Sequence, residues 1–178
     1  AFADYIKSKI RDGKTLDVSI NDEGDTILHL AAKSDNVELV KYLLEKGANP
    51  DMLNKSRKTT PLYEAIKKND VEIVRLLIKA GATINIREKD GFTPLHVAVI
   101  NAERTDEIVR LLLESGAEIN VKDNVFEYTP LHIAVMKNRK EIVKLLLENK
   151  ADRSIKDKAG KSPLDYATDE HIKNLLSK

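Results

Sequence analysis

The sequence predicts an all-α solenoid of stacked helix-turn-helix units with β-hairpin-like loops between them. Three observations predict it: a recurring four-letter string, an alanine at a fixed distance after each copy, and an apolar helix that ends near a glycine. Copies of the string start 33 to 36 residues apart, which is room for two short helices and a loop. A unit of that size cannot bury its own apolar faces, so neighbouring units must stack.

The recurring string opens the first helix of each unit. It reads TILH, TPLY, TPLH, TPLH and SPLD along the chain. A hydroxyl residue caps a helix and proline suits its first turn, so each copy predicts a helix start. The alanine that follows is small enough to let neighbouring helices approach closely. The copies begin at Thr26, Thr60, Thr93, Thr129 and Ser162.

A second helix follows in each unit and carries a broad apolar face. In the second unit it spans VEIVRLLIKA and is followed by Gly81. Apolar residues at this spacing predict a helix that packs on both sides. Glycine takes the left-handed conformation that closes a helix, so we expect this helix to end there.

Together these features resemble the ankyrin repeat, whose period and T-P-L-H-x-A signature recur over residues 13 to 178. The resemblance implies one ankyrin-repeat domain over residues 1–178. We divide it into an N-terminal half repeat (1–20), four repeats (21–54, 55–87, 88–123 and 124–156) and a shortened C-terminal capping repeat (157–178).

Both ends and three internal positions depart from the regular pattern. The half repeat is predicted from Phe2, Tyr5, Ile6 and Ile10, which share one helical face. Two extra residues lengthen the turn between the helices of repeat 3, within residues 101–106. The loops LNKSRKTT and KDNVFEYT each carry one extra residue, with Lys58 and Glu127 where a turn glycine is usual.

Composition excludes several classes of function. The chain has 30 Lys and Arg against 29 Asp and Glu, a net charge of +1, so a nucleic-acid partner is not expected. Without cysteine there is neither a disulfide nor a thiolate metal site, and no apolar run reaches the length of a membrane span. The compartment stays open. We favour the cytoplasm, although Ala1-Phe2-Ala3 also fits a signal-peptidase site and leaves an exported or periplasmic protein as an alternative.

Three of the four histidines occupy the same place in successive TPLH-like strings: His29, His96 and His132. Packed helices are about 10 Å apart, so rings one repeat apart cannot share a zinc ion with bonds of about 2 Å. We expect these rings to tie each helix to the neighbouring loop by hydrogen bonds. His171 is expected to be solvated. Neither a phosphate-binding loop nor a catalytic motif is present, so we predict no enzyme, metal or cofactor. Asn54-Lys55-Ser56 matches a glycosylation sequon weakly.

The resemblance implies that a protein partner binds along the concave side, at the loop tips and the first helices. Two of the three phenylalanines fall at adjacent loop tips, and the 125–128 tip has an extra residue without an evident packing purpose. We predict an apolar patch there, a basic strip in repeat 2, and a monomeric chain. The predicted partner-binding residues are Phe92, Ile100, Val125, Phe126, Tyr128 and Met136 in the patch, and Arg57, Lys58, Lys67 and Lys68 in the strip.

Three interpretations of function follow from these residues. The first is a protein-binding module that acts as an adaptor or as an inhibitor of a partner enzyme. The second is a structural spacer, for which the apolar patch would be dispensable. The third is an enzyme or metal-binding protein, which would need a polar pocket that joins histidines of different repeats.

Overall fold

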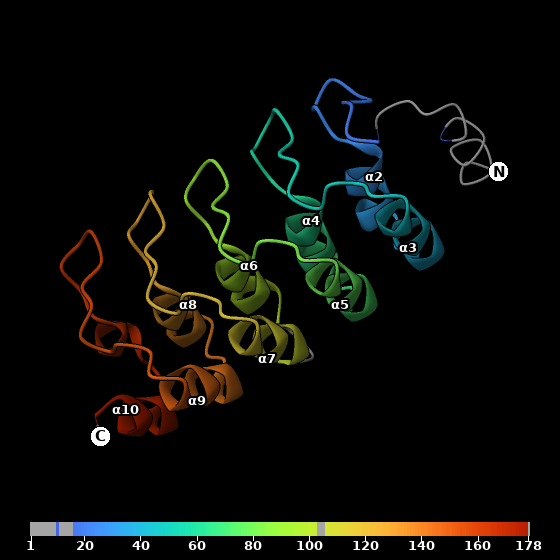
Figure 1. Cartoon of the computed structure of the whole chain (residues 1–178). Helices are drawn as coiled ribbons and strands as arrows, with labels where there is room; N and C mark the ends of the chain where they lie inside the picture. Colours follow the sequence, from blue (N-terminus) through green and yellow to red (C-terminus); the bar gives the residue numbers. More distant parts are fainter. Residues whose placement is uncertain (1–9, 11–15, 103–105, 178) are drawn as a thin grey trace. The chain divides into compact units, whose positions relative to one another are not determined.

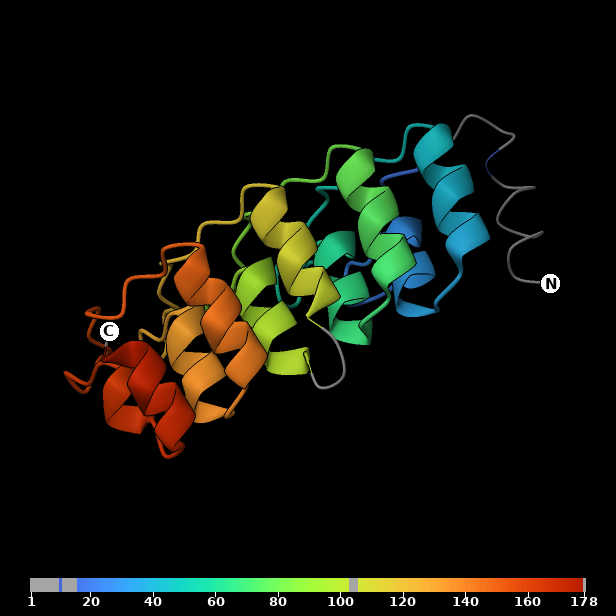
Figure 2. The same ribbon diagram turned by 90° about the horizontal axis from the view of Figure 1, so that it is seen from below.

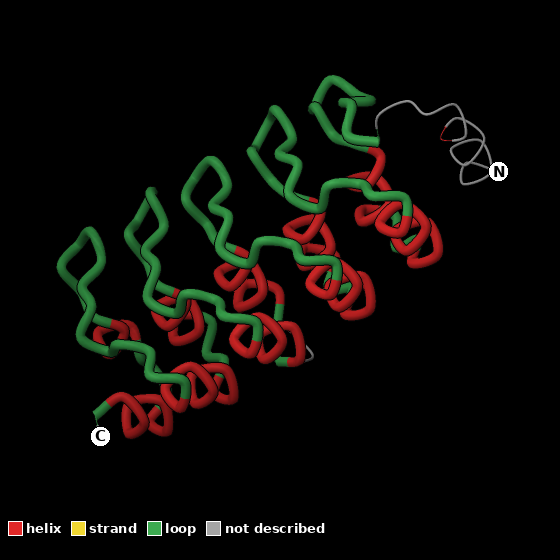
Figure 3. The backbone as a smooth tube through the Cα atoms, viewed as in Figure 1, coloured by secondary structure: helices red, strands yellow, loops and turns green. Residues whose placement is uncertain are grey.

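A computed structural model describes residues 10, 16–102 and 106–177 of the chain, and every regular element among them is helical (Figure 3). Short helices come in antiparallel pairs, and hairpin-like loops precede each pair (Figure 1). The predicted all-α fold of helix-turn-helix units is thus confirmed. Contacts divide the chain into two compact units, residues 1–83 and 84–178.

The first unit contains two helix pairs. Helix α2 packs against α4, and α3 packs against α5, so first helices form one layer and second helices another (Figure 2). Ala31 and Ala65 are completely buried between the layers, at the positions where the sequence predicts close helix contacts. The helices are α2 (Ile27–Lys33), α3 (Val37–Glu45), α4 (Pro61–Lys68) and α5 (Val71–Lys79).

The second unit contains two further pairs and a shorter terminal pair. Helix α8 contacts α6, α9 and the 3-10 helix η1, while α10 packs against α9 and η1. Lys140 and Asp169 join α9 to the start of α10 with an ion pair of 2.7 Å. The elements are α6 (Pro94–Asn101), α7 (Glu107–Glu114), α8 (Pro130–Met136), α9 (Lys140–Glu148), η1 (Pro163–Tyr166) and α10 (Glu170–Leu176).

Hydroxyl residues cap the first helices, as the recurring string predicts. The Oγ1 atoms of Thr26, Thr60, Thr93 and Thr129 each accept a hydrogen bond from the backbone N–H three residues later. At η1 the Asp165 carboxylate accepts from both the N–H and the hydroxyl of Ser162.

Left-handed residues close the second helices. Gly81 has φ of +88°, as predicted, and Gly47 and Gly116 adopt the same conformation. Lys150 takes φ of +66° at the equivalent position after α9, although it carries a Cβ. That position stores backbone strain.

A ladder of side-chain acceptors sets the spacing of successive loops. Asp17 accepts from the backbone N–H of Asn49, about one repeat later in the sequence. The side chains of Asp51, Asn85 and Asn120 accept in the same way from the backbone N–H groups of Thr83, Glu118 and Asp152. The repeat boundaries themselves stay a prediction. Most of the predicted N-terminal half repeat, including Phe2, Tyr5 and Ile6, lies outside the described residues, as do residues 103–105 of the lengthened turn.

Candidate functional site

Buried polar side chains fasten the tips of the loops from inside. In the α8 loop, residues 120–128, Asp123 is only 2% exposed. Its Oδ1 accepts from the N–H groups of Val125 and Phe126 at 2.7 and 2.8 Å, and its Oδ2 accepts from Tyr128 at 2.8 Å. Hydrogen bonds to a carboxylate are among the stronger ones, so the conformation of this tip is set before any partner binds.

Two side chains of the same tip are apolar and exposed to solvent. Val125 is 39% exposed and Phe126 is 53% exposed. The Phe126 ring stacks on Tyr128 with centroids 5.2 Å apart, and the Phe126 carbonyl accepts from Lys158 at 3.0 Å. A bulky apolar group is therefore presented on backbone whose polar groups are already paired.

The ring contacts continue from the α8 loop to the 3-10 helix η1. Tyr128 meets Tyr166 edge to face, with centroids 5.9 Å apart. The Tyr166 hydroxyl donates to Asp157, and this carboxylate raises the pKa of Tyr166 above its usual range. We call Phe126, Tyr128 and Tyr166 the aromatic row. Sequence reasoning missed Tyr166. It lies four residues after Ser162, the position that Ile133 occupies after Thr129 in α8.

The other apolar residues predicted for the patch differ in exposure. Met136 is 38% exposed at the end of α8. Phe92 is half-buried, with its ring edge-on to His96 at 5.6 Å, and Ile100 is half-buried in α6. Among the residues predicted for the patch, the exposed ones thus lie in the α8 loop and at the end of α8, whereas Phe92 also packs on His96.

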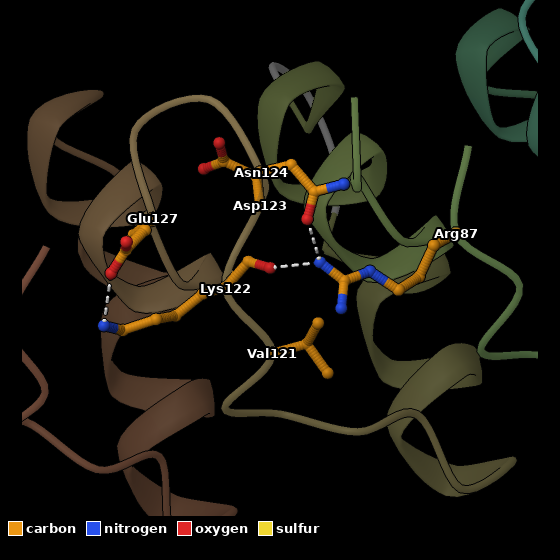
Figure 4. Close-up of a pocket in the computed structure, with 6 residues that line it drawn as sticks. All are labelled: Arg87, Val121, Lys122, Asp123, Asn124 and Glu127. Atoms are coloured by element: carbon orange, nitrogen blue, oxygen red, sulfur yellow. Dashed lines mark hydrogen bonds and ion pairs between the residues drawn. The ribbon is translucent and has the colours of Figure 1, made fainter. Parts of the chain in front are cut away.

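A polar hollow of about 550 Å³ lies between the α8 loop and Arg87 (Figure 4). The Arg87 guanidinium reaches across it and donates to the Lys122 carbonyl at 2.7 Å and to Asn124 at 2.8 Å. Lys122 and Glu127 also line the hollow and pair with each other at 2.8 Å. Glu127 has φ of +59°, so the residue that replaces the usual turn glycine keeps the left-handed conformation of glycine. The Arg87 hydrogen bonds hold the α8 loop to the segment that precedes α6.

The predicted basic strip belongs to the first unit, so it is a candidate surface of its own. Arg57 and Lys58 are exposed in the α4 loop, residues 51–59, and Lys67 and Lys68 are exposed in the last turn of α4. Apart from Lys58, these cations line a groove of about 640 Å³. The groove also contains carboxylates, so the strip forms one side of a mixed-charge surface. Its remaining lining residues are Glu23, Lys33, Asn54, Ser56 and Glu64.

A buried carboxylate beneath that groove neutralises one of its cations. Asp25 is completely buried and accepts from Lys33 at 2.6 Å, and from Asn21 and Asn54. Burial would raise the pKa of Asp25, but these hydrogen bonds and the lysine charge together lower it to about 2. Asp25 therefore stays ionised near neutral pH and holds Lys33 in place.

The three recurring histidines make the hydrogen bonds predicted for them. In each, Nδ1 accepts from the backbone N–H of the capping threonine, so Nε2 carries the proton and donates to a carbonyl of the next loop. Those carbonyls belong to Thr59, Tyr128 and Lys161, at 3.0, 3.0 and 3.2 Å. Burial lowers the pKa of His29, His96 and His132, although the carbonyl bonds oppose it. Among the described residues, no group of three potential metal ligands converges.

The fold buries the asparagine of the glycosylation sequon. Asn54 is only 2% exposed, and its side-chain nitrogen donates to Asp25. Its Oδ1 accepts from the N–H groups of Arg57 and Thr59. A glycan could not be attached there without opening the α4 loop.

Comparison with known proteins identifies the family. Within the described part of the chain, no helix combines the length and the apolar character needed to cross a membrane. A search of curated proteins finds no match. A family model of ankyrin repeats, described as three copies, matches residues 6–54, 28–123 and 105–178. Because these matches cover nearly the whole length, the chain belongs to the ankyrin-repeat family.

Proposed function

We propose that this chain binds another protein through the apolar surface around the α8 loop, and that it acts as an adaptor or as an inhibitor. Ankyrin repeats are generally protein-protein interaction modules. The observation that carries the proposal is the half-exposed Phe126 on a tip that Asp123 holds rigid. The surface comprises Val125, Phe126, Tyr128 and Met136, with Phe92 and Ile100 at its edge.

Both energy and entropy favour this surface as a contact. Covering the exposed half of a phenylalanine side chain stabilises a complex by roughly 1 to 2 kcal/mol. Aromatic anchors that fill a partner's pocket typically dominate an interface. Because the tip is already ordered, binding loses little conformational entropy there.

The basic strip contributes in a different way under this proposal. Arg57, Lys58, Lys67 and Lys68 are exposed, so an ion pair formed there adds little affinity. Their charge would mainly accelerate the encounter with an acidic partner surface. Neutralising them should slow association and weaken its salt dependence.

The proposal is tested by affinity capture from a lysate of the source cell. We compare the wild type with Phe126→Ala/Met136→Ala, and with a control, Glu141→Ala/Lys144→Ala, which changes exposed residues of α9. Matched melting curves would establish that all three chains fold. We expect one protein to be retained by the wild type and the control, and lost with the first variant. Equal retention by all three would rule out this surface.

Adaptor and inhibitor are separated by a second assay. If the captured protein is an enzyme, an inhibitor should block its activity at equimolar ratio, whereas an adaptor should leave it unchanged. If no protein depends on the patch, the spacer alternative gains support. Both ring nitrogens of His96 and His132 are already hydrogen-bonded within the fold, which argues against the enzyme or metal alternative.

A further inference from the structure

We infer that the aromatic row receives an acidic segment of the partner: a short stretch with one bulky apolar side chain flanked by aspartate or glutamate. This inference rests on the proposed function and names the chemistry of the partner at the same surface. It is carried by the charges that surround Phe126, Tyr128 and Tyr166.

Two lysines border the aromatic row, and a third follows Met136 at the C-terminal end of α8. Lys158, in the η1 loop of residues 154–161, donates its backbone N–H to Phe126 and lies with Nζ 3.5 Å from the Val125 carbonyl. Lys161 places Nζ 5.2 Å from the centre of the Tyr166 ring. Lys137 directly follows Met136 at the end of α8. All three are exposed, and none is paired with a carboxylate among the described residues.

The carboxylates of the same loops are already occupied. Asp123 and Asp157 are buried and accept hydrogen bonds from the loop backbone. Glu127 pairs with Lys122 at 2.8 Å. Asp165 accepts from Ser162 and pairs with Lys156 at 3.8 Å, and the Ser162 hydrogen bonds together with the charges of Lys156 and Lys161 lower its pKa. The internal partners of Lys158 and Lys161 are thus a carbonyl and an aromatic ring, and neither lysine forms an ion pair with a carboxylate among the described residues.

This arrangement has the layout of a protein interface, with an apolar centre and a charged rim. A basic segment would be repelled by the three lysines, whereas an acidic one would pair with them as its apolar side chain covers Phe126. Like charges across an interface repel, so the three lysines disfavour basic partner segments and add some affinity for acidic ones. The apolar centre supplies most of the affinity, and the lysines supply the preference.

The test uses designed peptides and the full chain. Three fluorescent peptides share a central Leu-Phe-Leu and differ only in flanking residues, which are glutamate, glutamine or lysine. We measure their dissociation constants by anisotropy at low and at physiological ionic strength. We expect the glutamate peptide to bind about tenfold tighter than the glutamine peptide, the lysine peptide to bind weakest, and the difference to shrink with salt.

Two variants with the same change in net charge complete the test. Lys137→Gln/Lys158→Gln/Lys161→Gln should remove the preference for glutamate and leave the glutamine peptide unaffected. Lys41→Gln/Lys79→Gln/Lys144→Gln changes exposed lysines on α3, α5 and α9 and should keep the preference.

The outcomes separate this inference from the proposed function. If glutamate and glutamine peptides bind equally, and Phe126→Ala weakens both, the surface binds apolar segments but the acidic preference is refuted. If the control triple variant loses the preference as fully as the first, overall charge explains it, and the inference is likewise refuted. If none of the peptides binds, the row does not receive short segments and the inference fails, while capture of a folded partner can still support the proposed function.

Discussion

Replacing Gly91 with alanine should destabilise the second unit more than the same change at Gly160. Both glycines occupy the turn position two residues before the helix-capping hydroxyl, with φ of +83° and +75°. A Cβ at Gly91 would lie 2.5 Å from Cγ of Asn124 and 2.7 Å from its backbone nitrogen. A Cβ at Gly160 would meet no atom within 4 Å.

The expected magnitudes follow from these contacts. A left-handed alanine costs about 1 to 2 kcal/mol relative to glycine, and Gly160→Ala should show only this cost. At Gly91 the α8 loop must also move away, which stretches the 2.8 Å hydrogen bond from the Asn124 N–H to the Asp90 carbonyl. Losing that bond adds about 1 kcal/mol, so Gly91→Ala should cost about 2 to 3 kcal/mol in total.

Urea unfolding followed by circular dichroism at 222 nm measures both variants against the wild type. Stacked repeats can unfold in more than one step, so the slope of each transition should be compared before midpoints are converted to free energies. Gly91→Ala should have the lower midpoint, and its free energy of unfolding should be about 1 kcal/mol below that of Gly160→Ala. Equal midpoints for the two variants would refute the argument that close approach of the α8 loop requires glycine at position 91.

Two further predictions concern local features of the fold. His29, His96 and His132 have pKa values lowered by burial, so unfolding takes up protons, and their contribution to stability is complete above pH 6.5 and lost as pH falls below it. The urea midpoint should therefore be lower at pH 5.5 than at pH 7.5, and an unchanged midpoint would contradict this account of the rings. Lys150→Gly should raise the free energy of unfolding by about 1 kcal/mol because it relieves a left-handed lysine, whereas Gly116→Lys should lower it by a similar amount. Thermal melts of these two variants check the signs, and two shifts in the same direction would refute the assignment.

Much of the fold could be predicted because the rules that set it are local. A threonine three residues before a histidine specifies both the cap and the ring's hydrogen bonds, wherever the string recurs along the chain. Gly81 marks a helix end for the same reason. The burial of Asn54 was beyond sequence reasoning, because it arises from Asp25 of the preceding loop.

The candidate surface was less predictable because exposure depends on neighbours distant in sequence. Phe92 and Phe126 look alike as loop-tip aromatics, yet only Phe126 projects well into solvent, since Phe92 packs on His96. Leu164 follows a proline exactly as Leu131 does. Leu131 is buried in α8, whereas Leu164 is 41% exposed on the short 3-10 helix η1. The two copies of the string read TPLH and SPLD, and neither difference predicts that Leu164 is exposed.

Site-specific photo-crosslinking tests the central claim most directly. Benzoylphenylalanine would replace Phe126 in one chain and Lys144, an exposed residue of α9, in another, and both would be irradiated in a lysate of the source cell. The account predicts a discrete adduct with one protein from position 126 and none from position 144. An adduct from position 144 without one from position 126 would contradict it, because the partner would then bind the second-helix layer and leave the aromatic row uncovered.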